Sequence, residues 1–165
     1  MKVKKRIMIA LAGAMILGVF GTSGAPMMAS ESQDPLFMIT IPADLTITQP
    51  GWNKAGTISM SVYQPGTIFL KTDEAQDDQG YRYLVNTKDE SLKIPYRLSG
   101  TDEEYYGQYS INKDEQDFPL VDQDTFSFLI GASIEEEDYS NMPPGEYMDT
   151  VTFEARFQKY IEPQR

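Results

Sequence analysis

The side chains that could carry chemistry in this chain are carboxylates and aromatics, because the sequence contains no histidine and no cysteine. Their absence excludes Cys nucleophiles, Ser-His-Asp triads and the imidazole or thiolate ligands that zinc, copper and iron sites favour. A two-carboxylate glycosidase site and a Ser-Lys pair remain. Because 25 acidic residues place some pairs at workable distances in any fold, acid content favours no catalytic site. We therefore expect a protein that is not an enzyme, with a small carboxylate-based hydrolase as the weakest alternative.

Carboxylates gather in two short segments of the chain. The first, residues 72–80, contains Asp73, Glu74, Asp77 and Asp78, and the second, residues 135–138, reads Glu-Glu-Glu-Asp. Hard oxygen ligands on flexible loops are what Ca²⁺ uses, but neither segment has the spacing of an EF-hand loop. We predict solvated hairpin tips and no cofactor, with calcium at the four carboxylates of the first segment as the alternative.

Aromatic residues form a second candidate site. Tyr105, Tyr106 and Tyr109 cluster in an acidic stretch, and Trp52 stands alone after the turn residues Pro-Gly. Exposed aromatics on loops can stack on sugar faces or anchor a protein partner. Alternatively, Trp52 packs against the end of the core and the tyrosines line a strand, which is the commoner use of such residues.

The elements that must position these residues are short strands. Apolar and polar residues alternate along 92–98, where Leu92, Ile94, Tyr96 and Leu98 share one face. Pro95, which has no N–H, predicts an edge strand or a bulge there. The same alternation, with Gly/Pro turns between segments, predicts strands at 37–41, 44–48, 57–63, 67–71, 81–86, 105–111, 125–130 and 150–157.

This pattern predicts an all-β fold. Short strands at regular spacing favour an immunoglobulin-like antiparallel β-sandwich of about seven to nine strands, with a barrel as the competing closure. Beyond the N-terminal segment, no window has a 3.6-residue apolar stripe, so we expect little helix.

The N-terminal segment has the three-part pattern of a signal peptide. Lys2, Lys4, Lys5 and Arg6 precede an uncharged apolar run over 7–20, and small residues follow toward Ala29. We predict a signal peptide at 1–29, a flexible mature N-terminus at 30–35 and one β-sandwich domain at 36–165. An uncleaved membrane anchor and an ordinary buried helix are the alternatives. The prediction implies a secreted or cell-surface protein with no membrane span in its mature part.

The mature chain is strongly acidic. Removing residues 1–29 leaves 10 basic residues against 25 acidic ones, a net charge of −15. Such a surface repels phosphate backbones and anionic lipid, so we expect neither nucleic acid nor a membrane surface as a partner. Cations and basic protein surfaces remain compatible with this charge.

Two phrases of the sequence resemble known domains. The segment 143–153, Pro-Pro-Gly-Glu-Tyr-Met-Asp-Thr-Val-Thr-Phe, is similar to the last strand of many exported bacterial immunoglobulin-like domains, including fimbrial subunits of the spore coat protein U type and Gram-positive surface proteins of the WxL class. The segment 39–47, Ile-Thr-Ile-Pro-Ala-Asp-Leu-Thr-Ile, looks like the opening strand of such domains. The resemblance implies the fold and an exported location. Export and an all-β domain without catalytic residue types favour a structural or adhesion component, whose partners are other cell-envelope proteins or further copies of itself. A carbohydrate-binding module that uses the aromatics on polysaccharide is the alternative.

Overall fold

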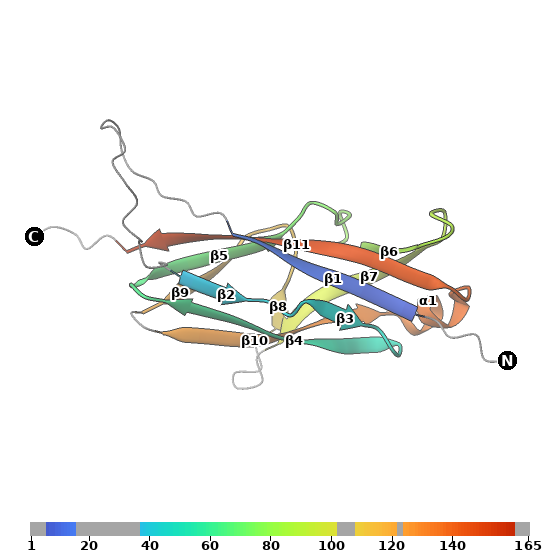
Figure 1. The fold of residues 1–165 in the computed structure, drawn as a ribbon, viewed down its shortest axis with the longest axis horizontal. Coiled ribbons are helices and arrows are strands. Elements are labelled where there is room, and N and C mark those ends of the chain that lie inside the picture. Colours follow the sequence, from blue (N-terminus) through green and yellow to red (C-terminus); the bar gives the residue numbers. More distant parts are fainter. Residues whose placement is uncertain (1–5, 16–36, 102–107, 122–123, 161–165) are drawn as a thin grey trace, which may run out of the picture.

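The structure is a computed structural model that describes residues 6–15, 37–101, 108–121 and 124–160. In this part of the chain it contains eleven strands and one short helix, drawn in Figure 1. The strands are β1 (Arg6–Met15), β2 (Phe37–Thr40), β3 (Asp44–Thr46), β4 (Gly51–Val62), β5 (Gly66–Thr72), β6 (Arg82–Asn86), β7 (Lys93–Thr101), β8 (Gln108–Ser110), β9 (Gln116–Leu120), β10 (Thr125–Ile134) and β11 (Glu146–Lys159), and the helix is α1 (Glu136–Asn141).

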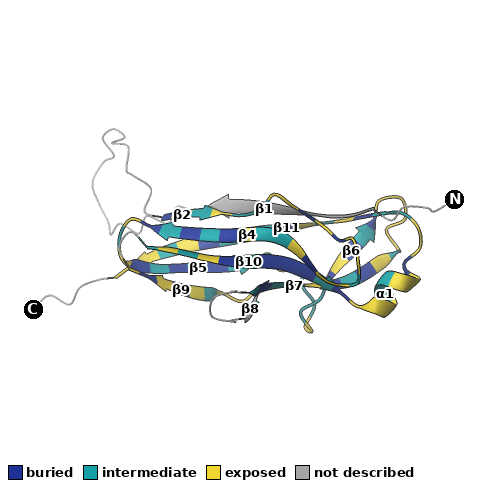
Figure 2. Cartoon of the chain, turned by 90° about the horizontal axis from the view of Figure 1, so that it is seen from below, coloured by how far each residue is buried: buried dark blue, intermediate teal, exposed yellow. Residues whose placement is uncertain are grey.

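The strands form two layers that run along the long axis of the molecule (Figures 1 and 2). One layer has the order β2-β4-β10-β7, with β8 beside β7. The other has β3-β1-β11, and β11 continues into β6 at its start and into β5 and then β9 at its end. All described pairs are antiparallel except β1 with β11, which is parallel. The predicted immunoglobulin-like β-sandwich is confirmed.

β7 connects the two layers. Its first half pairs with β6, where Pro95 lies opposite Tyr83, and its second half pairs with β10 from Arg97 onward. Pro95 therefore lies in the half of β7 that has one described strand partner, which is where a residue without an N–H is tolerated. The prediction of an edge position for this proline is confirmed.

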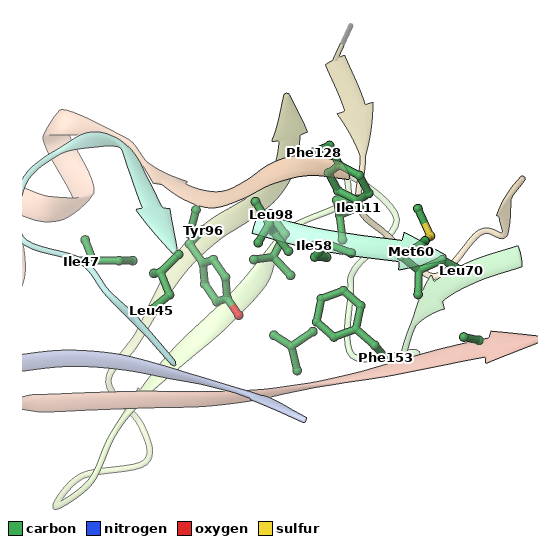
Figure 3. Close-up of a cluster of buried hydrophobic side chains, with 14 of the residues drawn as sticks. Leu45, Ile47, Ile58, Met60, Leu70, Tyr96, Leu98, Ile111, Phe128 and Phe153 are labelled. Atoms are coloured by element: carbon green, nitrogen blue, oxygen red, sulfur yellow. The ribbon is translucent and has the colours of Figure 1, made fainter. Parts of the chain in front are cut away.

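The core lies between the layers and follows the alternation of the sequence. Ile58, Met60 and Val62 are buried along β4, and Val151 and Phe153 are buried along β11. Figure 2 shows buried and partly buried residues alternating along β4, and Figure 3 shows side chains from both layers meeting in one cluster. Because the side-chain period of a strand is two, one face of each layer is dry and the other is wet.

The strands number eleven rather than seven to nine, for two reasons. β9 was absent from the prediction because it is short and contains Asp117 and Pro119, residue types that strands disfavour. Among the described strands it pairs with β5 alone, so Pro119 stands on an edge strand. β1 lies inside the segment predicted as a signal peptide, 1–29. The prediction of that signal peptide and of a flexible segment at 30–35 stays a prediction, since residues 16–36 lie outside the described part.

The helical content is small, as expected from the sequence. α1 spans six residues with three acids in its first turn and buries none of its side chains. Among the described residues, no helix has the length and apolar character needed to cross a membrane.

Candidate functional site

Trp52 lies half-exposed on the outer face of β4. Its side chain is 36 % exposed, and its indole Nε1 donates a hydrogen bond to Ser99 Oγ at 3.1 Å. Gly131 makes this position possible, because a Cβ there would lie 2.5 Å from the Trp52 ring and from the Asn53 carbonyl oxygen. The indole thus lies next to Gly131 of β10, at the point where the β4–β10 register shifts.

Two neighbours that the sequence analysis did not single out extend this outer face. Ser133 of β10 is paired with Trp52 on one side and with Arg97 of β7 on the other. The Arg97 guanidinium lies 4.0 Å from the centre of the Tyr81 ring, a cation–π contact. We name Trp52, Ser133, Arg97 and Tyr81 the outer row. Only cross-strand register, which a single sequence does not reveal, brings these residues into line.

Tyr109 lies apart from Trp52. Its ring contacts the rings of Phe118, Phe126 and Phe128, with centroid separations of 5.0 to 5.9 Å. Phe118 and Phe128 are buried, so Tyr109 continues the core rather than the outer row. Tyr105 and Tyr106, the other two predicted aromatics, lie outside the described residues. Among the described residues, Trp52 and Tyr109 therefore do not form one site, because Trp52 lies on the outer face and Tyr109 lies against the core.

The acidic segment 72–80 uses two of its four carboxylates internally. Asp77 Oδ1 accepts hydrogen bonds from the backbone N–H groups of Gln79 and Tyr81, and Asp77 Oδ2 accepts one from the Tyr83 hydroxyl. These hydrogen bonds lower the pKa of Asp77, that of the Tyr81 N–H having the largest effect. The carboxylate thus folds its own loop.

Asp73 is turned toward the interior, while Glu74 and Asp78 are exposed. Within the part of the chain that the structure describes, no three acidic residues are placed so that they could hold a metal ion together. Calcium binding by Asp73, Glu74, Asp77 and Asp78 stays a prediction, and nothing in the geometry adds to it.

A buried arginine organises the interior next to this loop. Arg82 of β6 is fully buried, and its guanidinium donates to Asp73 Oδ1 at 2.6 Å, to Asp149 Oδ2 at 3.0 Å and to the Thr150 carbonyl oxygen at 3.0 Å. The Tyr96 hydroxyl accepts from Arg82 Nε and donates to Asp149 Oδ2. Figure 3 shows this hydroxyl pointing from β7 toward β11. We call Arg82, Asp73, Asp149 and Tyr96 the Arg82 cluster.

The electrostatics of the Arg82 cluster keep Arg82 and Asp73 ionised. Burial by itself would lower the pKa of Arg82, but the hydrogen bonds to Asp73 and Asp149 raise it above its ordinary value. Burial likewise opposes ionisation of Asp73, yet the hydrogen bond from Arg82 and the one from the Thr152 N–H lower the pKa of Asp73. Burial and the charge of Asp149 raise the pKa of Tyr96. The tyrosine therefore stays protonated and serves as a donor, so the cluster joins three strands and a loop rather than performing acid–base chemistry.

The most unusual feature of the sheet is the strand that separates β3 from β11. β1 pairs with β11 along all ten of its residues, from Arg6 opposite Glu146 to Met15 opposite Ala155, and its other edge pairs with β3. Figure 1 shows β1 lying along β11. We call the position between β3 and β11 the strand slot. In the structure it is filled by residues that carry the sequence pattern of a signal peptide.

The β11 wall of the strand slot is apolar toward the core. Tyr147 and Val151 are fully buried, Phe153 is 1 % exposed, and the Tyr147 hydroxyl donates to the Pro143 carbonyl oxygen at 3.1 Å. On the β3 wall, Leu45 is also buried. In the register of the two strands, Ile7, Leu11 and Gly13 of β1 stand opposite Tyr147, Val151 and Phe153.

Comparisons with known proteins describe a distant likeness of shape. No family model matches the chain, and no curated protein matches it. A chain of a chaperone-tip adhesin complex from CFA/I fimbriae biogenesis aligns with a TM-score of 0.42 and 17 % identity, over 72 % of this chain and 38 % of that one. The DraE adhesin, solved with chloramphenicol succinate, aligns with a TM-score of 0.37 and 14 % identity, over 93 % and 91 % of the two chains. This chain thus spans well under half of the first of these proteins, and at such values neither likeness carries an argument about function.

Proposed function

We propose that the protein is a non-catalytic secreted or cell-surface component, structural or adhesive, that acts through protein–protein contacts. The observation that supports this most is the strand slot. If residues 1–29 are removed during export, β3 and β11 are left with facing backbone edges that none of the other described strands joins.

Unpaired strand edges are strong attachment sites for another polypeptide. Their N–H and C=O groups are obligatory hydrogen-bonding groups, and an added strand satisfies a whole row of them at once. In the strand slot the added strand would also cover Val151 and Phe153, which are core residues of β11. Backbone hydrogen bonds and apolar burial then act together, which is the physical basis of strand addition in protein recognition.

The polar groups of the interior support a structural role in the same way. The most elaborate polar arrangement in the described residues, the Arg82 cluster, is closed on itself: each of its charged groups is paired with a neighbour in the cluster. It fixes β6, β7 and β11 relative to one another, and so fixes one wall of the strand slot. This is the arrangement of a scaffold that holds an attachment edge in place.

Cell fractionation of the native host tests the proposal. We expect the protein in the culture medium or the cell envelope, with its N-terminus processed near Ala29 when the isolated protein is analysed by mass spectrometry. Recovery of the protein in the cytoplasm with its N-terminal segment intact would contradict the proposal.

The outer row gives a second candidate function, carbohydrate binding, a specific observation. Trp52 presents a half-exposed ring, and Arg97 and Tyr81 lie further along the same face. A polysaccharide pull-down with wild-type protein and the Trp52→Ala variant tests it. Retention that Trp52→Ala abolishes would favour this function, and no retention on any cell-wall or plant glycan would count against it.

A further inference from the structure

We propose that the mature domain accepts one extended apolar strand from a different polypeptide, which enters the strand slot parallel to β11. The inference rests on the proposed function and names the partner that fits the slot. It follows from three observations: the residues that fill the slot, the walls that line it, and the mature N-terminal residues that cannot fill it.

The occupant present in the structure defines the chemistry required of the partner. β1 reads Arg-Ile-Met-Ile-Ala-Leu-Ala-Gly-Ala-Met, ten residues with one charge at the first position. Its register places Ile7 opposite Tyr147, Leu11 opposite Val151 and Gly13 opposite Phe153. The partner strand therefore needs aliphatic residues at alternate positions, and a small residue where Phe153 of β11 stands opposite.

The walls explain why the strand must be long and apolar. Tyr147, Val151 and Phe153 are spread along β11 and belong to the same core as Leu45 of β3. In a mature domain with an empty slot this row would lose the neighbouring strand β1, and the burial of apolar surface then favours an occupant. A short strand that covers only one end of the strand slot would leave the apolar residues at the other end exposed to water. An occupant as long as β1 is therefore favoured.

The mature chain's own N-terminal residues do not supply this strand. Between the predicted cleavage site and β2 lie residues 30–36, Ser-Glu-Ser-Gln-Asp-Pro-Leu, which are fewer than the ten of β1 and include two acids and a proline. The next residues, Phe37–Thr40, already pair with β4 in the other layer. A copy of this chain therefore has no apolar N-terminal strand to give to the slot of another copy, and the partner is a different polypeptide.

Direction is set by the geometry of the slot. β1 runs parallel to β11 and antiparallel to β3. A strand inserted in the opposite direction would be parallel to β3 and would shift its side chains relative to the Tyr147, Val151 and Phe153 positions. We therefore expect one orientation to dominate.

The test uses residues 30–165 and a synthetic peptide of residues 4–15, whose Lys4, Lys5 and Arg6 keep it soluble. The mature chain is unfolded in urea and refolded with and without the peptide, and thermal unfolding and peptide binding are measured. We expect saturable binding and a higher midpoint of unfolding with the peptide; if the mature chain does not fold alone, we expect it to fold only in the presence of the peptide. A folded chain that ignores the peptide, or a chain that folds in neither arm, overturns the inference.

Matched peptides separate insertion from adhesion. Leu11→Asn places an amide opposite buried Val151, whereas Ala10→Asn places the same amide opposite Thr150, which is exposed. We expect the Leu11→Asn peptide to bind at least about tenfold more weakly and the Ala10→Asn peptide to stay within about threefold of the parent, because only the first buries an unpaired amide. Equal losses for the two peptides would overturn insertion in this register.

Engineered disulfides test the direction, since the chain has no cysteine of its own. A peptide with Met8→Cys should form a disulfide with Met148→Cys, its register partner, and not with Glu154→Cys at the other end of the slot. The reverse preference would overturn the parallel orientation. A protein that is found at the cell surface but takes up no strand would remove this inference and leave the proposed function standing, whereas a cytoplasmic protein would remove both.

Discussion

At the scale of single residues, the Arg82 guanidinium is the most demanding group in the fold. It is fully buried, and it is compensated by two carboxylates and a backbone carbonyl. Removing one partner of a buried ion pair leaves the other charges uncompensated in a low-dielectric interior. The loss of folding free energy is far larger than for a surface pair. We predict that Arg82→Met lowers the free energy of unfolding by about 3–5 kcal/mol, measured by urea denaturation.

The matched control is Arg156→Met. Arg156 also makes two hydrogen bonds to a carboxylate, that of Glu115, but its side chain is 46 % exposed. Because exposed ion pairs contribute about 0–1 kcal/mol, we expect a small effect there. Equal losses for the two variants would mean that the Arg82 cluster does not hold the interior together.

Asp73 makes the stability of the domain depend on pH. Its pKa is lowered in the folded state, with the Arg82 hydrogen bond and the Thr152 N–H overcoming the effect of burial. A carboxylate with a depressed folded pKa stabilises the protein above its unfolded pKa of about 4, and that contribution is lost as pH falls through the folded pKa. We predict that Asp73→Asn costs about 1.5–3 kcal/mol at pH 7 and progressively less below about pH 4, as measured by urea unfolding across pH.

Asp117→Asn on the edge strand β9 serves as the control for this pH series. Its side chain is exposed and lies on the wet face of the strand. We expect its effect on the free energy of unfolding to be small at every pH. A Asp73→Asn deficit that persists unchanged to low pH would contradict the assigned role of the Asp73 charge.

The burial of Arg82 is only partly predictable from the sequence. Alternation places Arg82 in phase with Leu84 and Asn86, so the inward position was readable from the strand pattern. Arginine is rarely fully buried, however, and its compensating carboxylates lie far along the chain, at Asp73 and Asp149. The strand pattern indicates that Arg82 points inward, but not that it is fully buried. Full burial depends on the tertiary contacts with Asp73 and Asp149, which the local pattern does not reveal.

At the scale of elements, the contact of β4 with β10 depends on the absence of a side chain at Gly131. A Cβ there would meet both the Trp52 ring and the Asn53 carbonyl oxygen at 2.5 Å, and the backbone oxygen cannot move aside independently. We predict that Gly131→Ala destabilises the domain by about 1–3 kcal/mol and displaces the indole from β10. Because Trp52 is the only tryptophan of the chain, its fluorescence reports the displacement as a shift of the emission maximum toward longer wavelength.

Ala132→Gly is a useful comparison on the same strand. It removes a side chain at a fully buried neighbouring position without introducing a clash. We expect it to weaken the domain while leaving the emission maximum of Trp52 in place. If Gly131→Ala also leaves the emission unchanged, the indole does not lie next to Gly131 of β10 as described.

Strands were the most predictable elements because period-two alternation is a local property. Thr57–Tyr63 and Thr150–Phe157 give the buried positions of β4 and β11 directly, and both strands extend beyond the predicted range because Gly51 and Glu146 continue the pairing without an apolar signal. β9 was missed because only two apolar residues, Phe118 and Leu120, mark its buried face, and Asp117 and Pro119 are residue types that strands disfavour. β1 was missed for a different reason: an apolar run after basic residues predicts export, and nothing local indicates that it matches the slot beside β11.

At the scale of the whole molecule, the net charge of the domain should affect how fast a strand reaches the strand slot. If residues 1–29 are removed, the remaining chain carries a net charge of −15, whereas the peptide of residues 4–15 carries three basic side chains and no acid. Opposite charges accelerate encounter over distances of about a Debye length, roughly 10 Å at 0.1 M salt, whereas the burial of the apolar strand sets how long the complex lasts. Association and dissociation should therefore respond differently to salt.

We predict that raising NaCl from about 50 to 500 mM slows association of the peptide by about tenfold and changes its dissociation rate by less than about twofold. Stopped-flow fluorescence with a labelled peptide measures both rates. A peptide in which Lys4 and Lys5 are replaced by glutamine should associate more slowly at low salt and lose most of the salt dependence, since its apolar residues are unchanged. A salt effect carried mainly by dissociation would contradict this division, because it would mean that ion pairs, rather than buried apolar residues opposite β11, hold the strand in its slot.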